Sequence, residues 1–284
     1  MNSKFKIQNL KFKISSLVLY FLLIGFTLAV LYPIVNVVSI SLRPDDRLLS
    51  TSLRIIPEGA SFHAFEVLFT QTPFLLWFWN SVLIAVVVTV TGVALASTAG
   101  YAFSRFEFYG KKGAMVGLLV TQMFPPTMLL LPMYIMLLKL HLINSYLGII
   151  VIYTSTALPF CVWQMKGYYD TIPFSLEEAA RIDGSTRWGA FVKVVLPLAA
   201  PALVITALFS FMTAWAEYVV AAQVLQDTSL FTLPLGLKQF QASMSTQWGL
   251  YAAGSLLVSI PAVALFLFLS RWLISGLTLG SVKG

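Results

Sequence analysis

The sequence predicts an all-α, polytopic membrane protein with six transmembrane helices in a single domain, and three observations support this prediction. Only 10% of the 284 residues are charged, whereas about 25% is typical of soluble proteins. Hydrophobic residues make up 58% of the chain, and the mean hydropathy is +0.86. The few charges leave six uncharged windows of 23 residues or more. This composition excludes an ordinary soluble enzyme, a disordered chain and a disulfide scaffold.

Each uncharged window is long enough to cross a bilayer as a helix, because about 20 apolar residues span a hydrocarbon core of about 30 Å. The windows are continuously apolar and do not alternate as the strands of a membrane barrel do. They cover 14–42, 67–104, 113–138, 140–165, 194–216 and 239–270. From these windows we expect spans at about 14–42, 78–103, 113–138, 146–165, 198–222 and 248–271.

The elements outside these windows follow in order. The first apolar run is too long for the core of a signal peptide, so we expect a retained first helix. The connection after it has room for a short amphipathic helix at 62–70. Pro125, Pro126 and Pro132 should bend or break the third span, because proline removes a helix hydrogen bond. Breaks of this kind are tolerated where a helix lines a cavity or packs on protein.

Orientation follows from the basic residues. Thirteen of the 18 Lys and Arg lie in segments that are inside if the N-terminus is cytoplasmic. The positive-inside rule therefore predicts that both termini are cytoplasmic. The same distribution explains the net charge of +7 without any binding of nucleic acid.

The longest inside connection, 166–197, holds four of the eleven acidic residues. Ser175 and Glu178 have the spacing of a capping box, which marks the start of a helix. Gly184 suits the left-handed position that ends a helix. A second short helix is expected at 186–194, and Pro197 should mark the turn into span five. The simplest interpretation is an amphipathic helix pair at the membrane surface that only joins two spans.

The spacing within this connection favours a second interpretation. Glu178, Ala179 and Ala180 are followed by Gly184, and then by Val194, Leu196 and Pro197. This pattern resembles the EAA loop of ABC importer permeases, with Val194 at a position where the family usually has isoleucine. In that family the loop docks as a coupling helix into a cleft of the ATP-binding subunit. The resemblance implies ATPase-coupling roles for Ser175, Glu178, Ala179, Ala180, Asp183, Gly184, Leu196 and Pro197.

The resemblance covers essentially the whole chain and is to the smaller permease of maltose-type sugar importers. The segments that carry it are 101–105 with Gly110 and Lys111, 123–125 with Leu131 and Pro132, 214–218, and the C-terminal tail 276–284. Ala216 replaces the asparagine of a motif near the end of span five. The resemblance implies a type I ABC importer permease fold with cytoplasmic coupling helices, in the cytoplasmic membrane of a bacterium or archaeon.

The same resemblance implies a set of partners. A second permease subunit would complete the pathway, and two ATP-binding subunits would carry ATP and Mg. An extracytoplasmic solute-binding protein would deliver a sugar or oligosaccharide to the outside loops, where 223–247 is the natural docking or release element. We expect no cofactor on this chain, because it has no phosphate loop of the type GxxxxGK[ST].

Residues for a substrate pathway are less clearly marked. The candidates are Gln122, Tyr134, Trp215 and Glu217. Gln122 could face a pore or bond an adjacent helix, and Glu217 could be functional or cap a helix at the outer interface. Trp77 fits an interfacial aromatic belt, and Asn80 and Ser81 fit caps of span two.

Other functional classes have little support in the residues. A secondary transporter commonly needs buried charges, and Glu217 is the one acidic candidate near the bilayer. A membrane enzyme would need paired acids, histidines or a nucleophile with its base, and His63 and His141 lie far apart without metal-ligand spacing. Cys161 lies in an apolar run, so we expect a buried, unreactive thiol.

Overall fold

The computed structural model describes residues 2–44, 48, 54–241 and 246–279, and side chains between 16 and 270 within these ranges. All regular elements in the described part are helices. Four helices are long and apolar enough to cross a membrane, and the number rises to six if each of two bent helix pairs is one span. The contacts divide the chain into two compact units, 1–72 with 240–257, and 73–239 with 258–284.

The first unit contains α1 (Asn2–Ser41), α2 (His63–Gln71) and the beginning of α13 (Trp248–Leu279). In the most apolar stretch of α1 no residue is buried, so its side chains need lipid or another protein around them. The short helix expected at 62–70 is confirmed as α2, with Leu68 buried.

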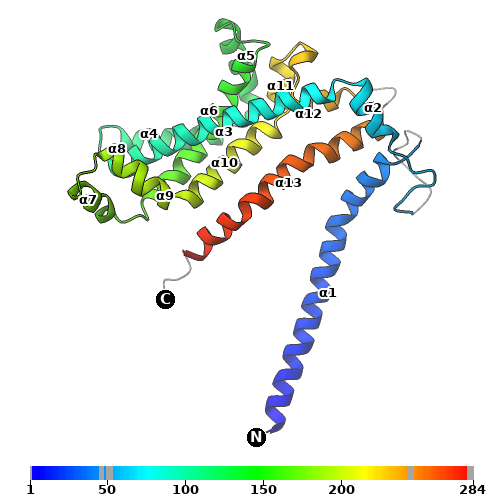
Figure 1. Cartoon of the computed structure of the whole chain (residues 1–284), viewed down its shortest axis with the longest axis horizontal. Helices are drawn as coiled ribbons and strands as arrows, with labels where there is room; N and C mark the ends of the chain where they lie inside the picture. The colour runs from blue at the N-terminus through cyan, green and yellow to red at the C-terminus, as the bar shows by residue number, and fades with distance from the viewer. Residues whose placement is uncertain (1, 45–47, 49–53, 242–245, 280–284) are drawn as a thin grey trace. The chain divides into compact units, whose positions relative to one another are not determined.

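The second unit is built around three helices that lie side by side (Figure 1), α3 (Phe74–Arg105), α6 (Tyr146–Tyr169) and α10 (Ala200–Trp215). Small residues allow the backbones to approach, as is typical of helices packed in membranes. A Cβ added to Gly92 would lie 2.7 Å from the hydroxyl of Ser210, so any larger residue there must displace this side chain. Cys161 is buried in the same core, as expected.

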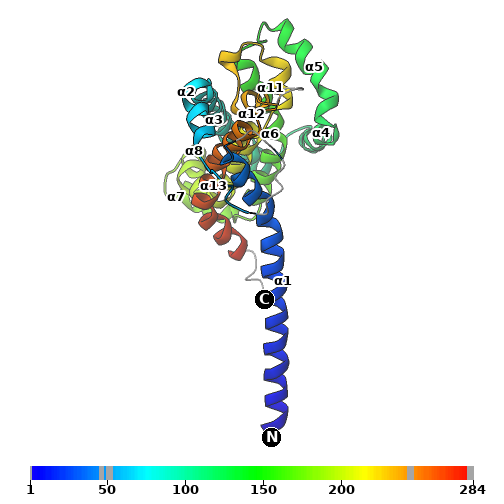
Figure 2. The ribbon, with the colours of Figure 1, turned by 90° about the vertical axis from the view of Figure 1, so that its right-hand side faces the viewer.

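The third span is broken, as its prolines predict. α4 (Lys111–Met123) and α5 (Pro126–Lys139) meet at an angle of 106° across a break of Phe124 and Pro125, and Figure 2 shows the bend. Pro132 lies inside α5 without ending it. The break therefore occurs at the tandem prolines, where two consecutive backbone N–H groups are missing.

Span five is shorter than expected. α10 ends at Trp215 rather than near 222, and α11 (Val219–Val224) follows after a non-helical break. A helix that the sequence did not reveal, α12 (Leu233–Lys238), lies in the connection to α13. The remaining elements form the connection between α6 and α10: α7 (Phe174–Ile182), α8 (Arg187–Ala190), a π-helical turn (Phe191–Val195) and α9 (Leu196–Leu198).

Candidate functional site

The predicted coupling loop, 166–197, contains α7, which begins directly after Pro173. The proline ring fixes φ at −58°, and ψ is 131°, so the chain enters the helix from an extended conformation. Gly184 follows the helix with φ +90°, a conformation that glycine adopts without steric cost. The left-handed stop expected at Gly184 is confirmed.

The capping box expected from Ser175 and Glu178 is wrong. α7 starts at Phe174, so Ser175 already lies inside the first turn. A capping box needs its serine at the non-helical position before the helix, which Pro173 occupies here without any side-chain cap. Both Ser175 and Glu178 are exposed instead.

The second half of the loop is helical, as expected, but is not a single α-helix. The Thr186 hydroxyl accepts a hydrogen bond of 3.0 Å from the N–H of Gly189 and so caps α8. The π-helical turn follows, and Pro197 in α9 cannot donate to the carbonyl four residues earlier. The turn into span five lies at Ala199, slightly after Pro197, where the helix axis bends by 79°.

α7 presents two faces with different chemistry. Four exposed residues at helical spacing form one face, called here the docking face: Ser175, Glu178, Ala179 and Ile182. Ile182 is 86% exposed, and Trp188 on α8 adds a large side chain that is 65% exposed. Apolar side chains displayed in this way are typical of a surface that another protein covers.

Most of the predicted coupling residues are accessible. Asp183, Gly184 and Pro197 are exposed together with the polar and alanine positions of the docking face, whereas Ala180 and Leu196 are half-buried. The structure therefore brings Ser175, Glu178, Ala179, Asp183 and Gly184 to the surface of one short segment.

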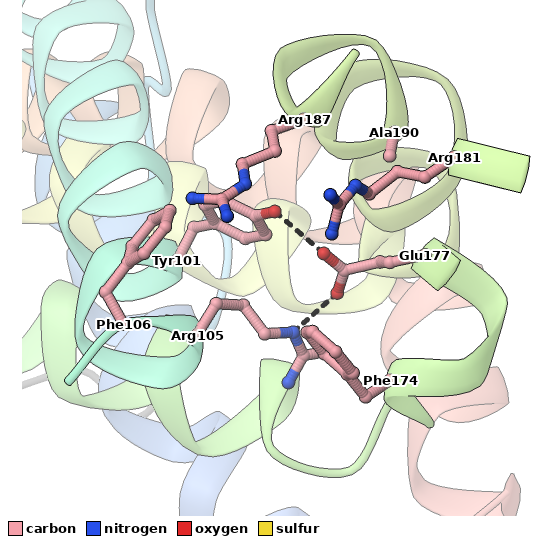
Figure 3. Close-up of a pocket in the computed structure, with 8 residues that line it drawn as sticks. All are labelled: Tyr101, Arg105, Phe106, Phe174, Glu177, Arg181, Arg187 and Ala190. Atoms are coloured by element: carbon pink, nitrogen blue, oxygen red, sulfur yellow. Dashed lines mark hydrogen bonds and ion pairs between the residues drawn. The ribbon is translucent and has the colours of Figure 1, made fainter. Parts of the chain in front are cut away.

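The opposite face of α7 contains a buried ion pair that sequence reasoning missed. Arg105, the last residue of α3, donates from Nε to Glu177 Oε1 at 2.5 Å, and Tyr101 donates its hydroxyl to Oε2 at 2.7 Å (Figure 3). The side chains of Arg105 and Glu177 are only 8% and 4% exposed. These three residues, Tyr101, Arg105 and Glu177, are called here the Glu177 cluster.

Further hydrogen bonds connect the Glu177 cluster to the end of α6. Arg105 donates from Nη2 to the carbonyl of Ile172 at 2.9 Å, and from Nη1 to the hydroxyl of Ser104 at 3.1 Å. Ser104 donates in turn to Asp170 at 2.7 Å, and Lys166 pairs with the same carboxylate at 2.6 Å. The ends of α3, α6 and α7 are therefore joined by one polar network.

A cavity of about 100 Å³ adjoins the cluster, and Figure 3 shows the side chains around it. It is lined by Tyr101, Arg105, Phe106, Phe174, Glu177, Arg181, Arg187 and Ala190. The guanidinium of Arg187 lies 6.0 Å from the centroid of the Phe106 ring, and that of Arg105 lies 5.9 Å from the Phe174 ring, both within cation–π range. Three arginines and one glutamate give the cavity a positive charge.

Aromatic side chains pack against Tyr101 of the Glu177 cluster. The rings of Tyr101 and Phe191 lie 4.4 Å apart, and Tyr169 packs edge-on against both. Phe191 is in the π-helical turn and is 1% exposed, so α3, α6 and the second half of the loop meet at these rings. Aromatic pairs of this kind contribute about 0.5–1.5 kcal/mol beyond their area burial.

The four pathway candidates differ in exposure and in the contacts they make. Gln122 is exposed near the break between α4 and α5, and its amide donates to the carbonyl of Thr156 in α6 at 3.1 Å. Tyr134 is half-buried in α5. Trp215 is 2% exposed, and its indole N–H donates to the carbonyl of Val258 at 3.0 Å. In this conformation Trp215 is a packing residue, and a pathway role for these residues stays a prediction.

Glu217 caps a helix. Its carboxylate accepts the N–H groups of Val220 at 2.8 Å and Ala221 at 3.2 Å, in the first turn of α11. Tyr153 of α6 donates its hydroxyl to the same carboxylate at 2.6 Å. Of the two interpretations of Glu217, the structure shows the helix cap, and the residue that pairs with the carboxylate is Tyr153 of the same chain.

The expected caps of span two have another role. Because α3 begins at Phe74, Asn80 and Ser81 lie inside the helix, so the cap assignment is wrong. Asn80 donates to the carbonyls of Ser229 and Phe231 at 2.8 and 3.0 Å. Ser81 accepts the N–H of Leu233 at 2.7 Å. These side chains hold the segment between α11 and α12 against α3.

Two exposed carboxylates outside the spans have lowered pKa values. A hydrogen bond from Lys111 lowers the pKa of Glu107, near the end of α3. The backbone N–H of Ser229 lowers the pKa of Asp227, because it favours the charged carboxylate. Both groups are charged at neutral pH.

The chain matches a known protein family over most of its length. Residues 92–278 match the family described as "Binding-protein-dependent transport system inner membrane component". The chain belongs to this family. The matched residues of this inner membrane component include the Glu177 cluster and the whole coupling loop.

Individual relatives of this inner membrane component agree with the family match. The chain is 37% identical to the maltose/maltodextrin transport system permease protein MalG of Escherichia coli (strain K12), over 93% of this chain and 95% of the relative. It is 31% identical to the maltodextrin transport system permease protein MalD of Streptococcus pneumoniae, over 100% of both chains.

A solved structure shows the same fold. A chain of a bacterial ABC transporter involved in the import of the acidic polysaccharide alginate superposes with a TM-score of 0.80. The match covers 91% of this chain and 96% of that chain, at 23% identity. The inner membrane component described here therefore has the fold of an ABC importer permease.

Proposed function

We propose that this chain is the membrane-spanning permease subunit of an ATP-driven, binding-protein-dependent importer of a sugar or oligosaccharide of the maltose type. The observation that carries the proposal is the near full-length similarity to maltose and maltodextrin permeases at 31–37% identity. The apolar helices and the broken third span agree with it. The chain forms half of the translocation pathway, and a second permease subunit supplies the other half.

The coupling loop is the contact with the motor of the transporter. The docking face of α7 combines the Glu178 carboxylate with the small Ala179 and the exposed Ile182, and Gly184 leaves open space at its end. An ATP-binding subunit with a complementary cleft covers these residues. ATP and Mg are bound by two such subunits, and this chain contributes the lever that they move.

The membrane is the bacterial or archaeal cytoplasmic membrane, with both termini inside. This orientation rests on the distribution of Lys and Arg and places α7 and α8 on the side of the ATP-binding subunits. The segment 223–247 then lies outside, where a solute-binding protein docks and releases the sugar. The bonds from Asn80 and Ser81 support this assignment, because they give the segment between α11 and α12 a fixed surface.

Sugar contacts are assigned to Gln122, Tyr134, Trp215 and Glu217. Gln122 is the most accessible of the polar candidates and lies beside the break of the third span. An amide at this place can exchange its bond to a helix carbonyl for a bond to a sugar hydroxyl. Glu217 and Trp215 would become available only after a rearrangement, because both are held within the chain.

Copurification and reconstitution test the proposal. A tagged chain should copurify with a second permease and an ATP-binding subunit. Vesicles that contain the complex should accumulate a maltodextrin only when ATP and a solute-binding protein are both supplied. Transport by the purified chain alone without ATP would contradict the proposal and indicate a secondary transporter.

A further inference from the structure

The Glu177 cluster places a carboxylate in the interior of the protein, next to an exposed helix face. Among the residues with described side chains, Glu177 is the only buried acidic residue. A buried carboxylate is costly unless it is paired and its remaining oxygen is satisfied. Here Arg105 satisfies one oxygen and Tyr101 the other, so the site for this carboxylate is completed by α3.

α7 is not adjacent to α3 in the sequence, so the two helices are connected only by contacts between their side chains. The coupling loop continues directly into α6 at one end and α10 at the other, and Arg105 lies 72 residues before Glu177. α7 therefore touches α3 only through folded contacts, and the shortest of these are the charged bonds of the cluster. α3 packs along both α6 and α10, which also contact each other, so a movement of α3 reaches all three helices of this unit's core.

The two faces of α7 have different roles: one is available to a partner protein, and the other contacts α3. Ser175, Glu178, Ala179 and Ile182 are exposed on the docking face. Phe174, Glu177 and Arg181 line the cavity beside α3, and of these three Glu177 is buried. A push on the docking face cannot separate α7 from α3 without leaving the charge of Glu177 or Arg105 buried and unpaired. That outcome is strongly unfavourable, so movement of α7 must carry the end of α3 with it.

We propose that Tyr101, Arg105 and Glu177 form a clamp that transmits the movement of the coupling helix to α3. They are positioning residues that touch neither ATP nor sugar. The inference rests on the proposed coupling role of the loop and goes beyond it by naming the span that receives the movement. A buried ion pair suits this task because its bonds are directional, whereas apolar side chains in contact can slide over one another.

The test uses the assembled complex in vesicles and measures sugar molecules transported per ATP hydrolysed. This ratio does not depend on how much complex folds, so a purely structural defect leaves it unchanged. Glu177→Arg and Arg105→Glu should each lower the ratio by about tenfold, because each places two like charges in contact. The double variant Glu177→Arg with Arg105→Glu should raise the ratio at least about threefold above either single variant.

A milder variant keeps the test decisive if charge reversal prevents assembly. Tyr101→Phe removes one hydrogen bond and introduces no charge, and should lower the ratio by about threefold. The matched control is the ion pair Glu107–Lys111 near the same end of α3, in which the Glu107 side chain is 90% exposed. Glu107→Lys should leave the ratio unchanged. An unchanged ratio in Tyr101→Phe and Glu177→Gln, or no recovery in an assembled double variant, would overturn the clamp.

These results are distinguishable from a failure of the proposed function. If the unaltered chain does not bind an ATP-binding subunit, the coupling role itself is wrong. If the unaltered complex transports sugar with ATP and the variants keep its ratio, only the clamp is wrong.

Discussion

Replacing Gly236 by alanine should disturb the segment between α11 and α13. Gly236 lies in α12, and a Cβ at this position would collide with ring atoms of Trp77. Trp77 has no room to withdraw, since it is 1% exposed and its indole N–H donates to the carbonyl of Thr228 at 3.0 Å. The added methyl group must therefore push α12 away from α3 or break this hydrogen bond.

The magnitude follows from three contributions. Overpacking of a filled interior costs about 1–3 kcal/mol, and loss of the bond from Trp77 to Thr228 costs about 1 kcal/mol. Alanine in a helix interior returns about 0.5–1 kcal/mol relative to glycine. We therefore expect the free energy of unfolding to fall by about 1–3.5 kcal/mol. Because α12 lies in the proposed docking element for the binding protein, binding-protein-dependent uptake should fall as well.

The assay is reversible unfolding in mixed detergent micelles, followed by tryptophan fluorescence. Gly117→Ala is the matched control, because Gly117 lies in the helix α4 with nothing within 4 Å of an added Cβ. It should be neutral or slightly stabilising. In a double-mutant cycle, Trp77→Phe should make Gly236→Ala less harmful, because the smaller ring leaves room for the methyl group. A Gly236→Ala chain as stable as the Gly117→Ala control would refute this reasoning.

Three further predictions concern the loop and the cap of α11. Gly184→Leu should weaken copurification of the ATP-binding subunit while membrane insertion stays normal. Gly184 has φ +90°, which strains leucine, and the space beside it that is open to a partner would be filled by the larger side chain. Normal copurification and normal uptake would contradict the docking assignment. Glu178→Lys should reduce sugar-stimulated ATP hydrolysis in vesicles, because it reverses an exposed charge on the docking face; unchanged stimulation would argue against a contact there. Glu217→Ala should destabilise the chain by about 1–2 kcal/mol in the same unfolding assay, the usual loss for a helix cap. If Glu217→Gln raises the KM for sugar at unchanged stability, Glu217 contacts substrate.

The sequence predicted the positions of helices and breaks where one local signal dominates. The start of α6 at Tyr146, the amphipathic α2 and the break near Pro125 all follow from nearby residues. The end of span five did not, because Ala214 to Tyr218 contain no proline or glycine that would mark the end of a helix. In the structure the Glu217 carboxylate starts a new helix there by capping α11.

Of the candidate site, the sequence predicted the exposed docking residues and not the buried Glu177 cluster. Ser175, Glu178 and Gly184 stand out by local spacing. The capping box was wrong because the N-cap position is occupied by Pro173, two residues before Ser175. The Glu177 cluster joins residues 72 positions apart, and neither Arg105 nor Glu177 has a local pattern that names its partner. Asn80 and Ser229, and Trp77 and Thr228, are likewise brought together only by the fold.

The π-helical turn at Phe191–Val195 has a mechanical consequence for the transporter. A π-helical turn holds one residue more than an α-helical turn, and each residue of an α-helix turns the chain by about 100°. A return of this turn to α-helical register would rotate α8, with Trp188, by about that angle relative to α10. A change of register at the junction between the loop and α10 would therefore turn the Trp188 side of the loop in one step of about 100° rather than gradually.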